Sequence, residues 1–206
     1  MFIKICGMTN ESAVVAAIEC GVDAIGFVFA PSTRRVTPQR AGQLSAQTPR
    51  DLLRIAVTCH PDQQLLDEIV RYVEPDFLQT DVMDLASLDL PAGLGVLPVL
   101  RSDEPAPPQL PRRLLFEGPL SGRGVSTDWE RAAELASRTE LILAGGLHAG
   151  NVAEAIRRVR PYGVDVSSGV ESASGVKDAR RMAEFVTAVR NASDVADRGE
   201  RESRKA

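Results

Sequence analysis

The stretch FIKICGMTNESAVVAAIECGVDAIGFVF, residues 2–29, decides the fold class. It begins with a short apolar run that ends at Cys6, continues with a helical pattern that Asn10 can cap and Gly21 can end, and closes with a second apolar run over residues 23–29. A strand, a helix and another strand in this order are typical of a parallel sheet covered by helices. The rest of the chain repeats this alternation.

Eight segments have the composition expected of strands. They are residues 2–6, 23–29, 52–57, 76–80, 94–100, 113–117, 140–146 and 163–168. Helical patterns between and after them are clearest at residues 10–21, 148–159 and 177–190. The stretches 81–91 and 103–111 are short or rich in proline, so we expect the fourth and fifth helices to be short or missing. The sequence therefore predicts an α/β protein, a single compact (β/α)8 TIM barrel.

The end of the chain has a different composition. Residues 191–206 carry many charges and a single valine, which is too little apolar surface for a packed element. A partner-binding segment is the alternative to a solvated one. We expect the barrel to occupy residues 1–190 and a charged, disordered tail to follow over residues 191–206.

Composition and charge restrict the class of partner. The 206 residues are 44% hydrophobic and 25% charged, with a net charge of −4, so the chain offers no basic face for nucleic acid. No apolar run approaches the roughly 20 residues of a membrane span, and the N-terminus lacks the pattern of a signal peptide. We expect a cytoplasmic protein whose partner is a small molecule.

The metal-ligating residue types are few. Three cysteines, Cys6, Cys20 and Cys59, show no CxxC spacing, which argues against a disulfide framework and against a structural zinc site. Two histidines, His60 and His148, would need carboxylate ligands that the sequence does not identify. We therefore expect no metal and no cofactor.

In a TIM barrel the active site lies at the C-terminal ends of the strands. The residues that end the expected strands are Cys6, Phe29, Thr58, Gln79, Asp81, Arg101, Glu117, Gly145, Gly146 and residues 167–169, with Arg34 and Arg35 in the loop after the second strand. Cys6 and Glu117 stand out because a thiol and a carboxyl group can both move protons. The alternative for Cys6 is an inert core thiol, and we expect Cys20 and Cys59 to be structural.

Two glycine-rich segments follow the last two strands. They read AGGLHAGN at residues 144–151 and SSGVES at residues 167–172. Their unhindered backbone N–H groups lie where many barrels bind phosphate, although a simple turn is the alternative for each segment. Arg34 and Arg35 could hold a carboxylate bidentately, or could be solvated loop residues.

Four motifs resemble the phosphoribosylanthranilate isomerase family, over residues 2–190. They are KICGMTN (4–10), DAIGFVFAPSTRRVTP (23–38), LAGGLHAGNVAEAI (143–156) and YGVDVSSGVESASGVKD (162–178). The resemblance implies a TIM-barrel enzyme of tryptophan biosynthesis. Such an enzyme converts N-(5-phosphoribosyl)anthranilate to the 1-deoxyribulose phosphate by an Amadori rearrangement, without metal or organic cofactor.

The resemblance also implies roles for individual residues. Cys6 matches the general base of the KICG motif, and Glu117 stands where the family has an aspartate as general acid. In the family, an arginine of this loop holds the anthranilate carboxylate. It matches either Arg34 or Arg35, because the loop is one residue shorter here than in the common form. The phosphate would be bound by Gly145, Gly146, Ser168 and Gly169.

Several positions depart from the family pattern, and they lie on the middle strands and their loops. Asp81 replaces a histidine, Arg101 and Pro98 stand where a lysine is common, and Ser121 and Thr127 replace a glycine and a phenylalanine. Glutamate keeps the chemistry of aspartate, because their ordinary pKa values are about 4.3 and 3.9. The extra methylene of Glu117 nevertheless moves its carboxyl group by about 1 Å, and a misplacement of that size can cost roughly 100-fold in rate.

These departures leave two other functions open. The chain could be a paralogous isomerase that acts on a different ribose 5-phosphate conjugate, or a non-catalytic protein that binds a phosphorylated ligand. Retention of Cys6 and Glu117 argues against the second. Asp81 and Asp165 could support the site, whereas Asp128 is expected to cap a helix. The sequence does not distinguish a monomer from a homodimer.

Overall fold

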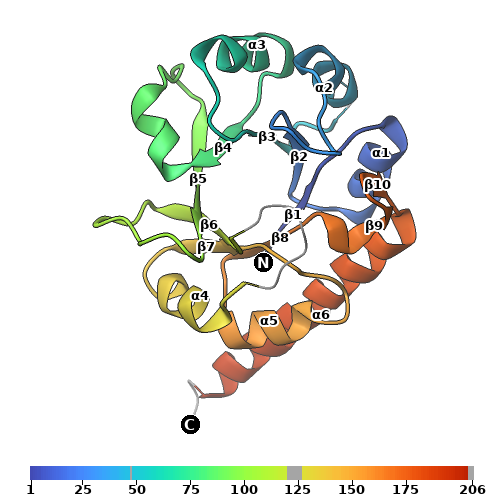
Figure 1. Ribbon diagram of the computed structural model, residues 1–206. Coiled ribbons are helices and arrows are strands. Elements are labelled where there is room, and N and C mark those ends of the chain that lie inside the picture. Colours follow the sequence, from blue (N-terminus) through green and yellow to red (C-terminus); the bar gives the residue numbers. More distant parts are fainter. Residues whose placement is uncertain (47, 120–126, 204–206) are drawn as a thin grey trace.

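The computed structural model describes residues 1–46, 48–119 and 127–203, with side chains described as far as Asp194. Eight parallel strands close into a barrel in sequence order, with β8 pairing against β1 (Figure 1). The strands are β1 (Phe2–Cys6), β2 (Ala24–Val28), β3 (Leu53–Val57), β4 (Phe77–Asp81), β5 (Gly95–Arg101), β6 (Arg113–Glu117), β7 (Glu140–Leu143) and β8 (Gly163–Val166). The predicted TIM barrel is confirmed.

Helices surround the barrel in Figure 1. The α-helices are α1 (Glu11–Cys20), α2 (Pro38–Ser45), α3 (Gln63–Val73), α4 (Trp129–Ala136), α5 (Val152–Val159) and α6 (Ala179–Ser203). Two short 3-10 helices, η1 (Val82–Ser87) and η2 (Ser168–Val170), follow β4 and β8. A small antiparallel pair, β9 (Glu171–Ala173) and β10 (Val176–Lys177), lies between η2 and α6.

The helix caps agree with the sequence signals. The Asn10 side chain accepts a hydrogen bond from the backbone N–H of Ala13 at the start of α1, and the helix ends at Gly21 with φ 65°. Asp128 accepts hydrogen bonds from the N–H groups of Glu130 and Arg131 at the start of α4, so the predicted role of Asp128 as a cap is confirmed. These caps therefore set the residues at which α1 and α4 begin.

The layer of helices is incomplete beside β4 and β5, as the sequence predicts. Only η1 follows β4, and all of residues 102–112, between β5 and β6, are described without any of them being helical. Prolines at positions 105, 107, 108 and 111 remove backbone donors that a helix would need. Short connections therefore leave this side of the barrel with less covering than the side under α5 and α6.

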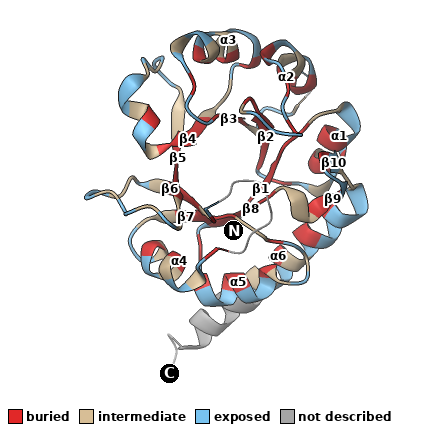
Figure 2. Ribbon diagram, viewed as in Figure 1, coloured by how far each residue is buried: buried red, intermediate tan, exposed pale blue. Residues whose placement is uncertain are grey.

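The core has an outer and an inner part, set by the two-residue period of the strands. In β1, Ile3 and Ile5 belong to the large cluster between the sheet and the helices. Lys4 and Cys6 alternate with them: Lys4 bonds to Asp165 of β8, and the sulfur of Cys6 lies close to Gly26 of β2. A smaller apolar cluster gathers residues from the barrel strands: Ala24, Ile55, Leu97, Val99, Leu115, Ile142 and Ala144. Figure 2 shows the strands as the most continuously buried part of the molecule.

The last helix is longer than the sequence predicts. Helix α6 runs to Ser203 and therefore continues past Arg190, into the segment where the sequence predicts a disordered tail. The division of the chain into a barrel, residues 1–190, and a tail, residues 191–206, stays a prediction.

Candidate active site

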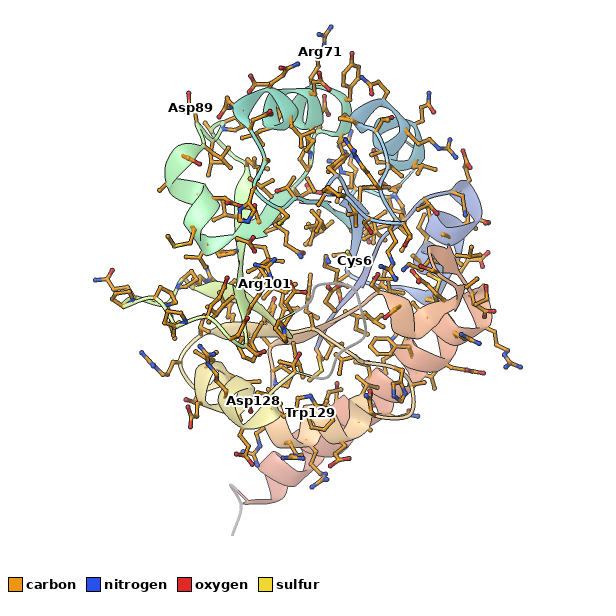
Figure 3. The ribbon with its side chains drawn as sticks, in the orientation of Figure 1. Cys6, Arg71, Asp89, Arg101, Asp128 and Trp129 are labelled. Carbon is orange, nitrogen blue, oxygen red and sulfur yellow. The ribbon has the colours of Figure 1, made fainter. Side chains whose placement is uncertain are left out.

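A pocket opens at the C-terminal ends of the strands, where a TIM barrel carries its active site. Cys6 and Arg101 both lie toward the inside of the ring of strands in Figure 3, while Arg71, Asp89 and Asp128 lie outside it. The expected site residues that line the pocket are Cys6, Arg34, Thr58, Gln79, Asp81, Arg101, Glu117, Gly145, Gly146, Asp165, Ser167 and Ser168.

Cys6 ends β1 and is 7% exposed, with its side chain at the wall of the pocket. Two glycines make room for this arrangement. A Cβ atom on Gly26 would lie 3.0 Å from the sulfur of Cys6, and one on Gly7 would lie 2.6 Å from Cδ of Arg34. Gly7 also has φ 88°, which favours glycine. The glycine of the KICG motif therefore lets Arg34 pass close to the end of β1.

Charges inside the barrel surround the Cys6 thiol. Lys4 is fully buried, and its Nζ atom donates a hydrogen bond to Oδ1 of Asp165 at 2.9 Å. Burial raises the pKa of Cys6 and the Asp165 carboxylate adds to this shift, while the ammonium groups of Lys4 and Lys177 and a hydrogen bond from Lys4 act in the opposite direction. A thiolate at Cys6 would therefore be a strong base whose charge is balanced by Lys4.

The attraction between Lys4 and Asp165 opposes the effect of burial on their charges. Burial alone would lower the pKa of Lys4, but Asp165 and Cys6 raise it above its ordinary value, so the ammonium stays charged. Burial raises the pKa of Asp165, and Lys4 opposes this shift. Asp165 thus lies inside the barrel and lines the pocket, and its supporting role stays a prediction.

The structure separates the two arginines of the second loop. Arg34 is 8% exposed and lines the pocket, with Nε and Nη2 donating to Oε1 and Oε2 of Glu171 at 2.6 and 2.8 Å. Arg35 is exposed and forms an isolated bridge with Val28, at a different hollow beside α3. Of the two, Arg34 is the one that can reach a ligand in the pocket.

Glu171, which the sequence analysis did not single out, fixes this arginine. Its carboxylate also accepts hydrogen bonds from Nζ of Lys177 at 2.6 Å and from the N–H of Gly175 at 3.1 Å. Although burial opposes the shift, these donors and Arg34 lower the pKa of Glu171 to about 2. Glu171 lies within the motif GVESASGVKD, but the sequence could not show that it pairs with Arg34, which lies 137 residues away.

The opposite wall carries a second set of charges, at the neighbouring ends of β4, β5 and β6. Arg101 donates from Nη1 to Oδ1 of Asp81, and its Nη2 atom lies 3.8 Å from Oε1 of Glu117. Burial lowers the pKa of Arg101, but Asp81 and Glu117 more than offset it, so the guanidinium stays charged. Two departures from the family pattern, Asp81 and Arg101, are therefore partners in the structure.

The glycine-rich loops reach the pocket in part. Gly145, Gly146 and Ser168 line it, whereas Gly169 packs tightly against the backbone of the preceding loop, where an added Cβ would lie 2.0 Å from the carbonyl oxygen of Leu147. The Asn151 side chain donates to the Gly146 carbonyl at 2.9 Å and so holds the first loop in place. Three of the four expected phosphate-binding residues thus face the cavity.

Two further positions complete the comparison with the sequence. Cys59, which the sequence analysis expected to be structural, lines the pocket, and its sulfur lies 3.6 Å from Oδ2 of Asp81. Thr127 is buried and donates to the carbonyl of Ala144 at 2.5 Å, so it ties the start of α4 to the end of β7. Ser121 lies outside the described residues.

Comparison with known proteins gives consistent matches over most of the chain. Residues 3–188 match the family model of N-(5'phosphoribosyl)anthranilate (PRA) isomerase. A relative from Roseiflexus sp. (strain RS-1), named N-(5'-phosphoribosyl)anthranilate isomerase, is 40% identical, over 93% of this chain and 98% of its own length. A relative of the same name from Mesorhizobium japonicum is 37% identical, over 93% of this chain and 96% of its own.

Solved structures agree with the sequence relatives. A phosphoribosyl anthranilate isomerase from Thermus thermophilus superposes with a TM-score of 0.80 at 27% identity, over 93% of this chain and 99% of its own. Another isomerase structure, with a TM-score of 0.74 and 26% identity, holds reduced 1-(o-carboxyphenylamino)-1-deoxyribulose 5-phosphate, over 93% of this chain and 99% of its own. At the same score, identity and coverage, a Thermotoga maritima isomerase is described as dimeric, with monomers generated from it.

A search of the helices in the described part of the chain finds none that is both long and apolar enough to cross a membrane.

Proposed function

Because the chain belongs to the N-(5'-phosphoribosyl)anthranilate isomerase family, we propose that Cys6 and Glu117 are the general base and general acid of its reaction. The chain is an aldose–ketose isomerase of tryptophan biosynthesis. The observation that carries the proposal is that Cys6, at the end of β1, and Glu117, at the end of β6, line one pocket from different sides. A sugar lying between them would meet a proton donor and a proton acceptor.

The reaction divides into two proton transfers. Glu117 protonates the ring oxygen of the ribose, the ring opens, and a protonated Schiff base forms between the sugar and the anthranilate nitrogen. The Cys6 thiolate then removes the proton from C2', and the resulting enolamine tautomerises to the ketose. In this last step C1' gains a proton and the hydroxyl on C2' loses one. The ring opening and the removal of the C2' proton each move a proton between the substrate and a side chain that lines the pocket, and neither needs a metal or an organic cofactor.

Lys4 and Asp81 have supporting roles in this proposal. The buried ammonium of Lys4 balances the negative charge of a Cys6 thiolate. Arg101 donates to Asp81, and its Nη2 atom lies 3.8 Å from Oε1 of Glu117. Asp81 would therefore hold Arg101 in the place from which Arg101 positions the Glu117 carboxyl group.

The remaining groups would bind the two ends of the substrate. Arg34, rather than Arg35, holds the anthranilate carboxylate, since Arg34 lines the pocket and Glu171 fixes its guanidinium. The backbone of Gly145, Gly146 and Ser168 would receive the phosphate, with Gly169 supporting the loop beneath.

The setting of the enzyme follows from the family. We propose a cytoplasmic location and a phosphorylated small-molecule substrate, with no nucleic acid or membrane partner. A relative that is described as dimeric makes a homodimer an alternative to a monomer. Ultracentrifugation of the purified chain would distinguish the two.

A second function has one observation in its favour. The wall formed by Asp81, Arg101 and Glu117 departs from the family motif, while the phosphate loops match it. A paralogous isomerase for another ribose 5-phosphate conjugate would combine these features in the same way. A non-catalytic binding protein is a weaker alternative, because it has no use for both Cys6 and Glu117.

One assay separates these functions. N-(5-phosphoribosyl)anthranilate is generated in situ, and its loss is followed by fluorescence for the wild type, Cys6→Ser and Glu117→Ala. Loss that depends on both residues would support the acid–base pair. Wild-type turnover that survives in either variant would refute the role of that residue, and a folded wild type without turnover would indicate a changed substrate.

A further inference from the structure

The loop after β3 and the end of β4 bring a thiol, an imidazole and a carboxylate together at the rim of the pocket. One ligand atom from each of Cys59, His60 and Asp81 lies within 4.8 Å of the other two. We propose that these three residues form a binding site for a divalent transition-metal ion of the zinc type, separate from the acid–base pair.

The two oxygen atoms of the Asp81 carboxylate have different neighbours. Its Oδ1 atom accepts from Arg101, whereas its Oδ2 atom lies 3.6 Å from the sulfur of Cys59 and 3.8 Å from Nε2 of His60. A metal ion between the three ligand atoms would therefore take Oδ2 and leave the contact with Arg101 in place. Ligand bonds of about 2.0–2.3 Å require the three atoms, which lie within 4.8 Å of one another, to move closer together.

His60 is oriented from behind, as metal-binding histidines usually are. Its Nδ1 atom lies 2.7 Å from Oδ1 of Asp84, and its backbone N–H donates to Oδ2 of the same carboxylate at 3.0 Å. Thr80 donates to that Oδ2 atom at 2.6 Å, and Asp84 itself is buried. A proton held on Nδ1 by Asp84 leaves the lone pair of Nε2 pointing toward Cys59 and Asp81.

The ligand types select the class of metal. A thiolate and an imidazole with one carboxylate suit Zn²⁺ or Co²⁺, whereas Mg²⁺ and Ca²⁺ prefer oxygen ligands alone. Binding converts the Cys59 thiol to a metal-bound thiolate and releases its proton to solvent. Three protein ligands leave a fourth position for water on the side of Cys59 that faces the pocket.

The metal site shares Asp81 with the wall that holds Glu117, so occupation should also lower turnover. This part of the inference rests on the proposed function. A cation at Oδ2 competes with Arg101 for the negative charge of Asp81. Because Nη2 of Arg101 lies 3.8 Å from Oε1 of Glu117, occupation should change how Arg101 holds the Glu117 carboxyl group.

Cobalt titration of the metal-free protein tests the binding site directly. We expect a thiolate-to-cobalt charge-transfer absorption that saturates at one Co²⁺ per chain, disappears when Zn²⁺ is added, and is unaffected by Mg²⁺. The absorption should be absent in Cys59→Ser and retained in Cys20→Ser, a matched change at the end of α1. No such absorption in the wild type, or its retention in Cys59→Ser, would overturn the site.

Two further variants test the geometry. His60→Ala removes a ligand whose side chain is 72% exposed, so the fold should be unaffected while the affinity for Co²⁺ falls at least tenfold. Asp84→Asn should weaken binding by about 10- to 100-fold through the orientation of His60. Unchanged Co²⁺ affinity in His60→Ala would exclude this ligand set.

Zinc sensitivity tests the coupling to turnover. Zn²⁺ should inhibit the wild type at the concentrations where it displaces Co²⁺, and the inhibition should shift to at least tenfold higher Zn²⁺ in His60→Ala. Binding without inhibition would refute the coupling while leaving the site in place. A wild type without turnover would instead refute the proposed function, because the cobalt absorption is measured without substrate.

Discussion

The two walls of the pocket are built differently. On the side of β8 and β1, Lys4 and Asp165 form a pair inside the barrel with almost no exposure to solvent. On the side of β4 to β6, Arg101 and Glu117 lie nearer the rim, with side chains 17% and 12% exposed. The first wall carries motifs that match the family, and the second carries the departures. Removing one member of a fully buried ion pair costs more than removing one member of a pair that water can partly solvate, so the first wall should tolerate substitution less well.

The largest expected effect is on stability, at the first wall. Lys4→Met removes the partner of Asp165 and leaves a buried carboxyl group unpaired, which should lower the free energy of unfolding by about 3–5 kcal/mol. Urea unfolding at neutral pH measures the change. The matched control is the double variant Lys4→Met/Asp165→Asn, which should recover part of the loss; a Lys4→Met protein as stable as the wild type would show that this wall tolerates change.

Cys6→Ser should lower turnover by at least about 100-fold, equivalent to about 2.7 kcal/mol in the activation barrier, because a serine hydroxyl is a far weaker base than a thiolate. The free energy of unfolding should change little, since the two side chains are nearly the same size. Cys20→Ser, outside the pocket, serves as the control and should keep wild-type turnover. Equal turnover in the Cys6 and Cys20 variants would remove Cys6 from the mechanism.

At the second wall, Glu117→Asp should lower turnover by about tenfold. The shorter side chain withdraws the carboxyl group from Arg101, which lies 3.8 Å from Oε1 in the wild type, and a displacement near 1 Å can cost up to roughly 100-fold. Steady-state rates of Glu117→Asp and Glu117→Ala measured together would show whether length or charge matters more. A Glu117→Asp variant with higher turnover than the wild type would show that this wall does not require the longer side chain of glutamate.

The two loop arginines give a smaller and more specific comparison. Arg34→Lys should raise KM by several-fold, up to about tenfold, because lysine loses the planar fork that binds a carboxylate, whereas Arg35→Lys should leave KM unchanged. Steady-state kinetics on both variants decide between them. A raised KM in Arg35→Lys alone would reverse the assignment of the carboxylate site.

A pH dependence tests the ion pair that holds Arg34 at the first wall. The pKa of Glu171 is about 2 in the folded protein against an ordinary value of 4.5, so its contribution to stability is fully present above pH 4.5 and is lost as the pH falls toward 2. The difference in unfolding free energy between wild type and Glu171→Gln should therefore shrink as the pH is lowered from 6 to 3. Urea unfolding at several pH values measures it, and a constant difference would contradict the shifted pKa.

Local patterns in the sequence predicted the barrel and several of the residues that line the pocket. Alternating strand and helix signals fixed the element order, and the end of each strand identified Cys6, Glu117 and the two glycines after β7 as pocket residues. These predictions succeeded because each depends on a few consecutive residues and on one general property of TIM barrels.

Pairings across the barrel could not be predicted in this way. The contacts of Arg34 with Glu171 and of Cys59 with Asp81 join residues 137 and 22 positions apart, on different loops. Arg34 and Arg35 are adjacent and chemically identical, and only the path of the backbone, with Arg35 bridged to Val28, turns one toward the pocket. In an irregular loop the side chains follow no regular repeat. The sequence therefore cannot show which of two neighbouring residues points into the pocket.

The closure of β8 against β1 has a consequence for the timing of synthesis. Lys4 is made well before its partner Asp165, which follows 161 residues later. At translation rates of about 5–20 residues per second, Lys4 and Cys6 wait roughly 8–32 s on the nascent chain before the strand that completes their environment exists. An activity measured during translation should therefore appear only after β8 has been made, however early the first half of the barrel begins to fold.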